Sequence, residues 1–221
     1  MLYDGRMRIL LLATAATLLI AQSNPNAINN DQARVIFAND KPHAKNAPHD
    51  HKLNRVMIYL TAGKQEITPV GGKAEVLNIK AGDVKWSAAS GMHTSEVVSD
   101  EALKIVEVEV KKPGDPSKTP KTDLDPLKVA PKDYHLEFEN AQVRVVRVKF
   151  PAHHQVPQHE HLLNRVVVYL TDQNGKMISA DGKEETATHK AGEASWGGPV
   201  KHKEENLMDK PFEAIVVEFK S

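Results

Sequence analysis

The 221-residue sequence contains no cysteine. Disulfide bonds, iron–sulfur ligation and a thiol nucleophile are therefore excluded for this chain. Basic and acidic residues are equally numerous, at 29 each, so the composition lacks the positive excess that is typical of nucleic-acid-binding proteins. Aromatic residues make up only 5% of the sequence, which disfavours an aromatic-lined carbohydrate site. No segment repeats apolar residues at the helical period over three turns, which leaves strands and turns as the expected structure.

The N-terminal segment has the pattern of a targeting signal. Arg6 and Arg8 precede an apolar run from Ile9 to Ile20, and small residues follow it up to Ser23. We therefore predict a signal peptide over residues 1–23 and a mature protein that is exported, to the periplasm or the extracellular space, without further membrane contact. The alternative is an uncleaved membrane anchor, but the apolar run is short for a span of about 20 residues.

One stretch of the sequence occurs twice. H-D-H-K-L-N-R-V-M-I-Y-L-T begins at His49, and H-E-H-L-L-N-R-V-V-V-Y-L-T begins at His159, 110 residues later. The correspondence continues to His93 and His202, after the loss of one residue from the second copy. Eight of the eleven histidines fall into such pairs, which scattered surface histidines would not do. The repeat predicts two domains of similar structure.

The segment between the two copies is rich in proline and lysine. It runs from Lys111 to Lys132 and has little apolar content, which is typical of an extended, solvated linker. We predict an N-terminal domain over residues 24–112, a linker over residues 113–131 and a C-terminal domain over residues 132–221. A long loop inside a single domain is the alternative interpretation.

Within each copy the pattern is one of strands and turns. V-R-V-V-R-V-K-F, from Val143 to Phe150, alternates apolar with basic residues, as expected for a strand with one solvated face. Arg55–Leu60 and Arg165–Leu170 are almost continuously apolar, as expected for central strands. Short strands without a helical layer bury a core by closing into a barrel or a sandwich. We therefore predict an all-β protein with two such domains.

The repeated histidines have the spacing of metal ligands. Residues i and i+2 of a strand face the same side, so each His-x-His pair directs two imidazoles toward one point. A third histidine from a later strand would complete one face of an ion and leave the opposite face open to water or substrate. The two candidate sites are His49, His51 and His93 in the first copy and His159, His161 and His202 in the second. Imidazole accepts Fe, Mn, Ni, Cu and Zn, so the sequence predicts a divalent metal without identifying it.

These motifs resemble those of the cupin superfamily. P-Q-H-E-H (Pro157–His161) and G-G-P-V-K-H-K-E-E-N (Gly197–Asn206) are similar to its two motifs, and P-H-D-H (Pro48–His51) and S-G-M-H-T-S-E-V (Ser90–Val97) are similar in the first copy. The resemblance covers both copies and implies a bicupin, that is, two tandem double-stranded β-helix barrels of the jelly-roll type. It also implies that dimers through barrel edges are common, so a homodimer is compatible with the sequence.

The sequence departs from the family pattern at one position. The resemblance implies a glutamate ligand three or four residues after the His-x-His pair, where this chain has Arg55 or Val56 and Arg165 or Val166. Each predicted site therefore retains three histidines. If Arg55 and Arg165 point into the barrels, they would bind a substrate carboxylate. If they point outward, they would pair with surface acids, and the sequence leaves both orientations open.

Polar residues near the third histidines are candidates for supporting roles. Glu96, Glu205 and Asn206 follow His93 or His202 closely, so we predict that they lie behind the ligands and orient an imidazole. The resulting functional hypothesis is metal-dependent chemistry on a small anionic or oxygen-rich molecule, of the dioxygenase, decarboxylase or isomerase kind that the family includes. The alternatives are a small-molecule or carbohydrate binding module without turnover, and a structural bicupin whose sites are relics.

Overall fold

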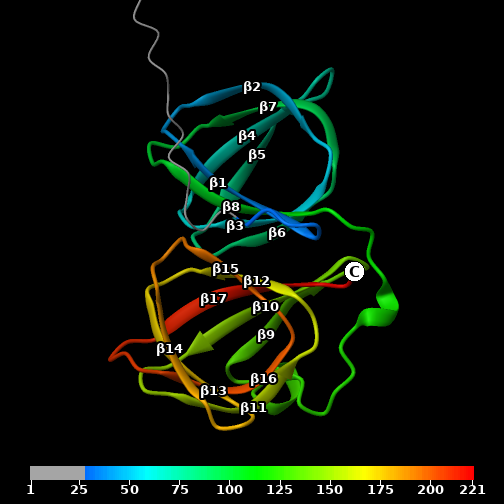
Figure 1. Ribbon diagram of the computed structural model, residues 1–221. Coiled ribbons are helices and arrows are strands. Elements are labelled where there is room, and N and C mark those ends of the chain that lie inside the picture. Colours follow the sequence, from blue (N-terminus) through cyan, green and yellow to red (C-terminus); the bar gives the residue numbers. More distant parts are fainter. Residues whose placement is uncertain (1–27) are drawn as a thin grey trace, which may run out of the picture.

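The computed structural model describes residues 28–221 of the chain. The predicted signal peptide lies outside these residues. The described part is nearly all β, and its strands form four antiparallel sheets, two in each repeat. The two repeats form two barrels stacked one on the other, with the chain between them running down one side (Figure 1). Among residues 28–221, no helix is both long and apolar enough to cross a bilayer. The prediction of an all-β fold with two barrels is confirmed.

The N-terminal barrel consists of two four-stranded sheets with the orders β1-β8-β3-β6 and β2-β7-β4-β5. Its strands are β1 (Ala33–Asp40), β2 (Lys45–His51), β3 (Asn54–Tyr59), β4 (Gly63–Pro69), β5 (Glu75–Ile79), β6 (Val84–Ser87), β7 (Ser90–Val97) and β8 (Leu103–Val110). Each sheet is assembled from strands that are distant in sequence, as in a jelly roll. The strand with the His-x-His pair, β2, therefore lies beside β7, which carries the third histidine.

The C-terminal barrel repeats this arrangement with sheets of the orders β15-β12-β17-β10-β9 and β11-β16-β13-β14. Its strands are β9 (Tyr134–Glu139), β10 (Val143–Phe150), β11 (Gln155–His161), β12 (Arg165–Tyr169), β13 (Gln173–Ser179), β14 (Glu184–His189), β15 (Ala194–Gly197), β16 (Val200–Asn206) and β17 (Phe212–Phe219). The similarity extends to the backbone of one turn, because His43 and His153 both have positive φ angles, of 57° and 54°.

The segment between the barrels contains two single turns of helix, η1 (Pro116–Lys118) and α1 (Pro126–Val129). Asp125 caps α1 by accepting a hydrogen bond from the backbone N–H of Leu127, and Pro126 occupies the first helical position, where its missing N–H costs nothing. Both Asp125 and Pro126 are buried. The segment is therefore packed against the C-terminal barrel at α1 and is solvated only in part.

The two barrels share an apolar core. In β3, Val56 and Ile58 alternate with Met57 and Tyr59, and only the first pair belongs to a cluster that also contains Val166 and Val168 of β12, among others. The sheet β1-β8-β3-β6 therefore packs face to face on the sheet of β12 through its outward side chains. The inward side chains of both sheets line the barrel interiors. Strands buried on two faces explain the near-continuous apolar runs in the sequence.

We predict that Ile58→Ala destabilises the protein by about 2–5 kcal/mol, because it leaves a cavity in this shared core. Ile58 is fully buried. Urea unfolding followed by tryptophan fluorescence measures the loss. Val70→Ala is the control, because Val70 is 69% exposed and its truncation should change the stability by less than about 0.5 kcal/mol. Equal stability of the two variants would contradict the shared core.

Candidate metal centres

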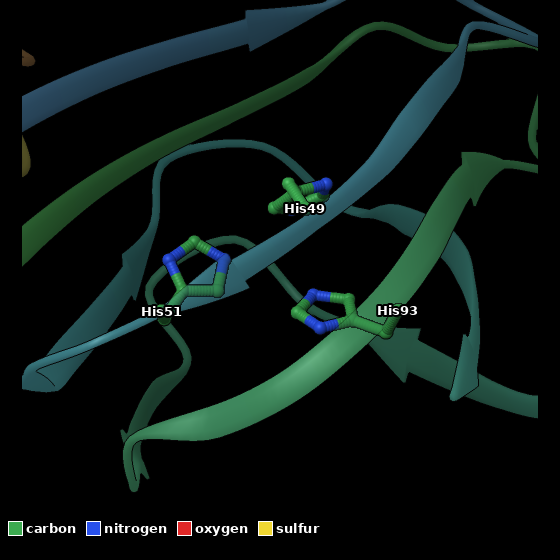
Figure 2. A group of neighbouring side chains, drawn as sticks. All are labelled: His49, His51 and His93. Atoms are coloured by element: carbon green, nitrogen blue, oxygen red, sulfur yellow. The ribbon is translucent and has the colours of Figure 1, made fainter. Parts of the chain in front are cut away.

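In the N-terminal barrel the structure brings His49, His51 and His93 together. His49 lies directly opposite His93 in the antiparallel register of β2 and β7, and the ligand nitrogens of the three residues lie within 4.8 Å of one another. Figure 2 shows the imidazoles gathered between these two strands. His93 is buried, whereas His49 and His51 are partly exposed. The Nδ1 atoms of His49 and His93 lie 2.8 Å and 3.0 Å from the carbonyl oxygens of Ala47 and Gly91.

In the C-terminal barrel His159, His161 and His202 form the equivalent group, and here all three are buried. His159 lies opposite His202 in the register of β11 and β16. The ring centroids of His159 and His202 are 4.5 Å apart, and those of His159 and His161 are 5.2 Å apart. The spacing predicted from the sequence is therefore realised in both repeats, with the second group more deeply enclosed.

Hydrogen bonds orient the C-terminal imidazoles. The Nδ1 atom of His159 lies 2.9 Å from the carbonyl oxygen of Pro157, and that of His161 lies 2.9 Å from Oε1 of Glu218. Donation from both Nδ1 atoms fixes the tautomer in which each Nε2 carries a lone pair. Both ring nitrogens of His202 are buried without a hydrogen-bond partner among the described residues. Buried polar atoms are almost always paired, so the unpaired nitrogens of His202 fit the presence of a bound cation.

A carboxylate that the sequence analysis did not select lies beside these rings. Glu204 is two residues beyond His202 on β16 and shares its face. Its Oε2 atom lies 3.5 Å from Nε2 of His159 and accepts a 2.5 Å hydrogen bond from the hydroxyl of Tyr134. Burial and the charge of Glu204 raise the pKa of Tyr134 well above its ordinary value, so the phenol stays protonated and remains a donor.

Both arginines at the position of the family glutamate point into the barrels. Arg55 and Arg165 are buried. Arg55 lines a cavity with all three N-terminal histidines, and Arg165 lines one with His161 and His202. The C-terminal cavity has a volume of about 300 Å³. The guanidinium of Arg165 donates to the carbonyl of Gly198 and has no carboxylate within 4 Å among residues 28–221. It packs flat against Gly197, where a Cβ would lie 3.1 Å from Cζ of Arg165.

Arg55 differs because an acid accompanies it. Glu107 of β8 projects into the same N-terminal cavity, with Oε2 at 3.5 Å from Nε of Arg55. Burial raises the pKa of Glu107, and the charge of Arg55 opposes this shift. The position equivalent to Glu107 in the C-terminal barrel is Val216, and the position equivalent to Glu204 in the N-terminal barrel is Ser95. The carboxylate nearest the functional groups of each cavity therefore comes from a different strand, Glu204 from β16 and Glu107 from β8.

A chain of buried charges lies behind His161. Glu218 accepts from Nε of Arg144 through Oε2 at 2.6 Å, while its Oε1 atom faces His161. The NH1 group of Arg144 donates to Oδ2 of Asp125 at 2.5 Å. Asp125, Arg144, Glu218 and His161 are all buried. Burial tends to raise the pKa of Glu218, but His161 and Arg144 outweigh it and hold that pKa below its ordinary value.

The three residues predicted to lie behind the ligands have other contacts. Strand parity turns Glu96 and Glu205 away from the histidines, toward Lys45 at 3.1 Å and Lys176 at 2.9 Å. Asn206 is buried and donates to the carbonyl oxygens of Pro151 and Lys210. It therefore fixes two loops and touches no imidazole. The acids that do accompany the C-terminal histidines are Glu204 and Glu218, so these replace Glu205 in the description of the site.

A signal for some of the missed residues was present in the sequence. The order H-K-E on a strand places Glu204 on the face of His202, and the pair Asp125-Pro126 is typical of a helix start. No such signal existed for Tyr134, since β9 joins the edge of the sheet beside β10 only through tertiary structure.

Comparisons with known proteins bear on the fold. No family profile matches the sequence, and no curated protein matches it. Solved structures do match. AerE from Microcystis aeruginosa is 15% identical, with a TM-score of 0.64 over 90% of this chain and 95% of that chain. A cupin 2 conserved barrel domain protein from Leptotrichia buccalis is 15% identical, with a TM-score of 0.53 over 87% and 86%. Bacillus subtilis oxalate decarboxylase, in a structure concerned with its Mn(II) centres, is 11% identical, with a TM-score of 0.57 over 86% and 69%.

The chain has the cupin fold, twice. The arrangement as a bicupin agrees with the sequence repeat and with the two histidine groups. Identities of this size establish the fold and leave the chemistry to be argued from the residues of this bicupin.

We predict that the metal-free bicupin loses stability as the pH falls from 6.5 to about 4. Burial lowers the pKa of His202 from 6.5 to about 4, so the unfolded chain binds a proton in this window and the folded protein does not. His202 alone should account for roughly 2–3 kcal/mol. Urea unfolding of wild type and His202→Asn at pH 7 and pH 4.5 measures the difference.

The control is His135→Asn, which removes an exposed imidazole. The loss between the two pH values should be smaller in His202→Asn than in wild type and the control. The same loss in all three proteins would contradict a buried, neutral His202.

Proposed function

We propose that each barrel binds a divalent metal ion on its three histidines and that the C-terminal barrel acts on a small carboxylate substrate. The observation that carries this proposal is a cavity lined by His161 and His202 of the buried histidine group and by the guanidinium of Arg165, which has no carboxylate within 4 Å among residues 28–221. A metal ion supplies Lewis acidity or activates dioxygen. The positive charge of Arg165 supplies recognition, since a guanidinium binds a carboxylate through two parallel hydrogen bonds.

The donor set of the C-terminal site fits a metal that accepts both nitrogen and oxygen. Three imidazole nitrogens suit Fe, Mn, Ni, Cu or Zn, and the Glu204 carboxylate beside His159 offers a nearby oxygen. The structure of oxalate decarboxylase that has the same fold concerns Mn(II) centres, which supports manganese as the first metal to test. Glu204 and the Tyr134 hydroxyl would also lie beside a substrate bound between the metal and Arg165, where they can hold or orient a proton.

The C-terminal barrel is the better candidate for catalysis because its arginine is available. In the N-terminal barrel Glu107 already lies beside Arg55, so an anionic substrate would have to displace a buried carboxylate. The N-terminal histidines are also more exposed, and an open site excludes water less well. We infer that the N-terminal site holds a metal without turnover or binds a different ligand.

A binding module without turnover is the second candidate function. The same metal and Arg165 would bind a small acid. An enzyme and a binding module of this kind would differ only in whether a product forms. The scarcity of aromatic side chains argues against a sugar ligand. Export of the protein and assembly as a homodimer remain predictions from the sequence, to be tested by fractionation of cells and by sedimentation of the purified protein.

We predict that the purified protein binds about two equivalents of Mn(II), and that His161→Ala binds about one, because the variant removes a ligand from one site. Elemental analysis and electron paramagnetic resonance measure both values. His135→Ala, at an exposed histidine, should retain both equivalents. Absence of bound metal in the wild type, after reconstitution with each of the candidate metals, would refute the proposal.

We predict that Arg165→Met weakens the binding of small carboxylates to the Mn(II)-loaded protein by about tenfold or more, because a charge-assisted pair is lost. Calorimetry with oxalate and with other small mono- and dicarboxylic acids measures the affinity, and release of carbon dioxide or uptake of oxygen measures turnover. The metal content should not change. Arg55→Met is the matched variant in the other barrel and should have little effect. Equal losses in the two variants would contradict the assignment to the C-terminal barrel.

A further inference from the structure

The repeat allows the surroundings of His161 and His51 to be compared, because the two residues occupy equivalent positions. Each barrel also has an equivalent Arg–Glu pair on neighbouring strands. In the C-terminal barrel the pair is Arg144 with Glu218, and in the N-terminal barrel it is Arg34 with Glu109. The two pairs differ in how many glutamate oxygens the arginine binds. This number determines whether a glutamate oxygen remains to accept a hydrogen bond from the histidine.

In the N-terminal barrel the arginine uses both oxygens of its glutamate. Nε of Arg34 donates to Oε2 of Glu109 at 2.6 Å, and NH2 donates to Oε1 at 3.0 Å. This two-pronged geometry is the preferred one for an arginine and a carboxylate. Glu109 has no further hydrogen bond to a histidine, and His51 has no hydrogen-bond partner within residues 28–221.

In the C-terminal barrel the arginine uses only one oxygen. Nε of Arg144 donates to Oε2 of Glu218, while its NH1 group is directed to Asp125. The NH2 group of Arg144, whose counterpart in Arg34 binds the second glutamate oxygen, is buried without a hydrogen-bond partner among the described residues. Oε1 of Glu218 instead accepts from Nδ1 of His161. A carboxylate behind a ligand histidine fixes the ring and increases its basicity. The two arginines thus differ in orientation, and Asp125 is the acceptor that holds NH1 of Arg144 in the C-terminal barrel.

Asp125 belongs to the segment between the barrels, and several contacts hold that segment in place. The backbone N–H of Glu160, between the two ligand histidines of β11, donates to the carbonyl oxygen of Leu124 at 2.8 Å. The hydroxyl of Thr122 donates to Oε2 of Glu160 at 2.9 Å. The segment is therefore hydrogen-bonded to β11, the strand that carries His159 and His161. Asp125 lies in the buried part of the segment.

Resting on the metal site proposed above, we propose that Asp125 is a positioning residue for the C-terminal metal. By holding NH1 of Arg144, it fixes the guanidinium in an orientation in which NH2 does not bind Glu218, so that Oε1 of Glu218 is left to orient His161. The linker is then a functional part of the C-terminal site as well as a connection between barrels. The N-terminal site, which lacks this arrangement, is the weaker of the two.

The test uses Asp125→Asn in full-length protein that also carries His51→Ala, so that one site remains. Asparagine keeps an oxygen for the N–H of Leu127, so the cap of α1 is retained, but it offers an N–H₂ group where Arg144 needs an acceptor. We expect the dissociation constant for Co(II) to rise about 10- to 100-fold, with a changed visible absorption spectrum of the bound Co(II). Asp123→Asn, at a fully solvated acid of the same linker, is the matched control and should bind as the parent does.

A second variant tests the same argument in the opposite direction. Arg34→Met, in protein that carries His161→Ala, removes the two-pronged partner of Glu109 and frees it for His51. Because the side chain of Arg34 is half exposed, this variant does not depend on the stability of the linker. We expect Co(II) to bind the N-terminal site several-fold more tightly.

The outcomes separate the two proposals. If the parent proteins bind no Co(II), the metal sites themselves are refuted. If the parents bind Co(II), and Asp125→Asn binds it with the affinity and spectrum of Asp123→Asn, the role of Asp125 is refuted while the sites stand. Unchanged affinity in Arg34→Met would likewise overturn the argument from the freed glutamate oxygen.

Discussion

The alternation of side chains along strands that are buried on both faces determines where the functional groups of this bicupin lie. In β3 and β12 the outward residues, such as Val56 and Val166, form the core between the barrels. The inward residues, including Arg55 and Arg165, are thereby committed to the cavities. A shift of one residue in either strand would exchange the two sets. The apolar contact between barrels therefore also fixes the position of the charged groups inside them.

The same parity explains how much could be predicted from the sequence. The His-x-His pairs and the third histidines lie on regular strands whose period is visible in one dimension, so the two clusters were predictable from spacing alone. The orientation of Arg165 could not be predicted, because the alternation of side-chain faces cannot be followed through the turn between β11 and β12. Closeness in sequence to His202 does not separate Glu204 from Glu205, but the alternation of faces along β16 places only Glu204 on the side of His202. The linker was expected to be solvated from its composition, but Asp125 is an exception that only tertiary contacts with Arg144 reveal.

The two barrels have their histidines at equivalent positions but their cavity glutamates at different positions. In the C-terminal cavity Glu204 adjoins an imidazole, whereas in the N-terminal cavity Glu107 adjoins the arginine. An acid beside the imidazoles lowers the charge of a bound ion and adds an oxygen donor. An acid beside the arginine instead neutralises the group that would attract a substrate. The two sites therefore share a fold but differ in the charge beside the imidazoles and beside the arginine.

If a divalent metal binds the C-terminal histidines as proposed, the charges around the cavity would bear on which ligand it accepts. A divalent ion on three neutral imidazoles keeps its full charge, Glu204 compensates half of it, and Arg165 adds a further positive charge without a partner within 4 Å among the described residues. Isolated charge in a cavity of about 300 Å³ is poorly solvated and is costly unless it is paired. A small anion that spans the ion and the guanidinium removes this cost, whereas a neutral molecule does not. Under the proposed function, this charge balance would favour a compact carboxylate as the ligand.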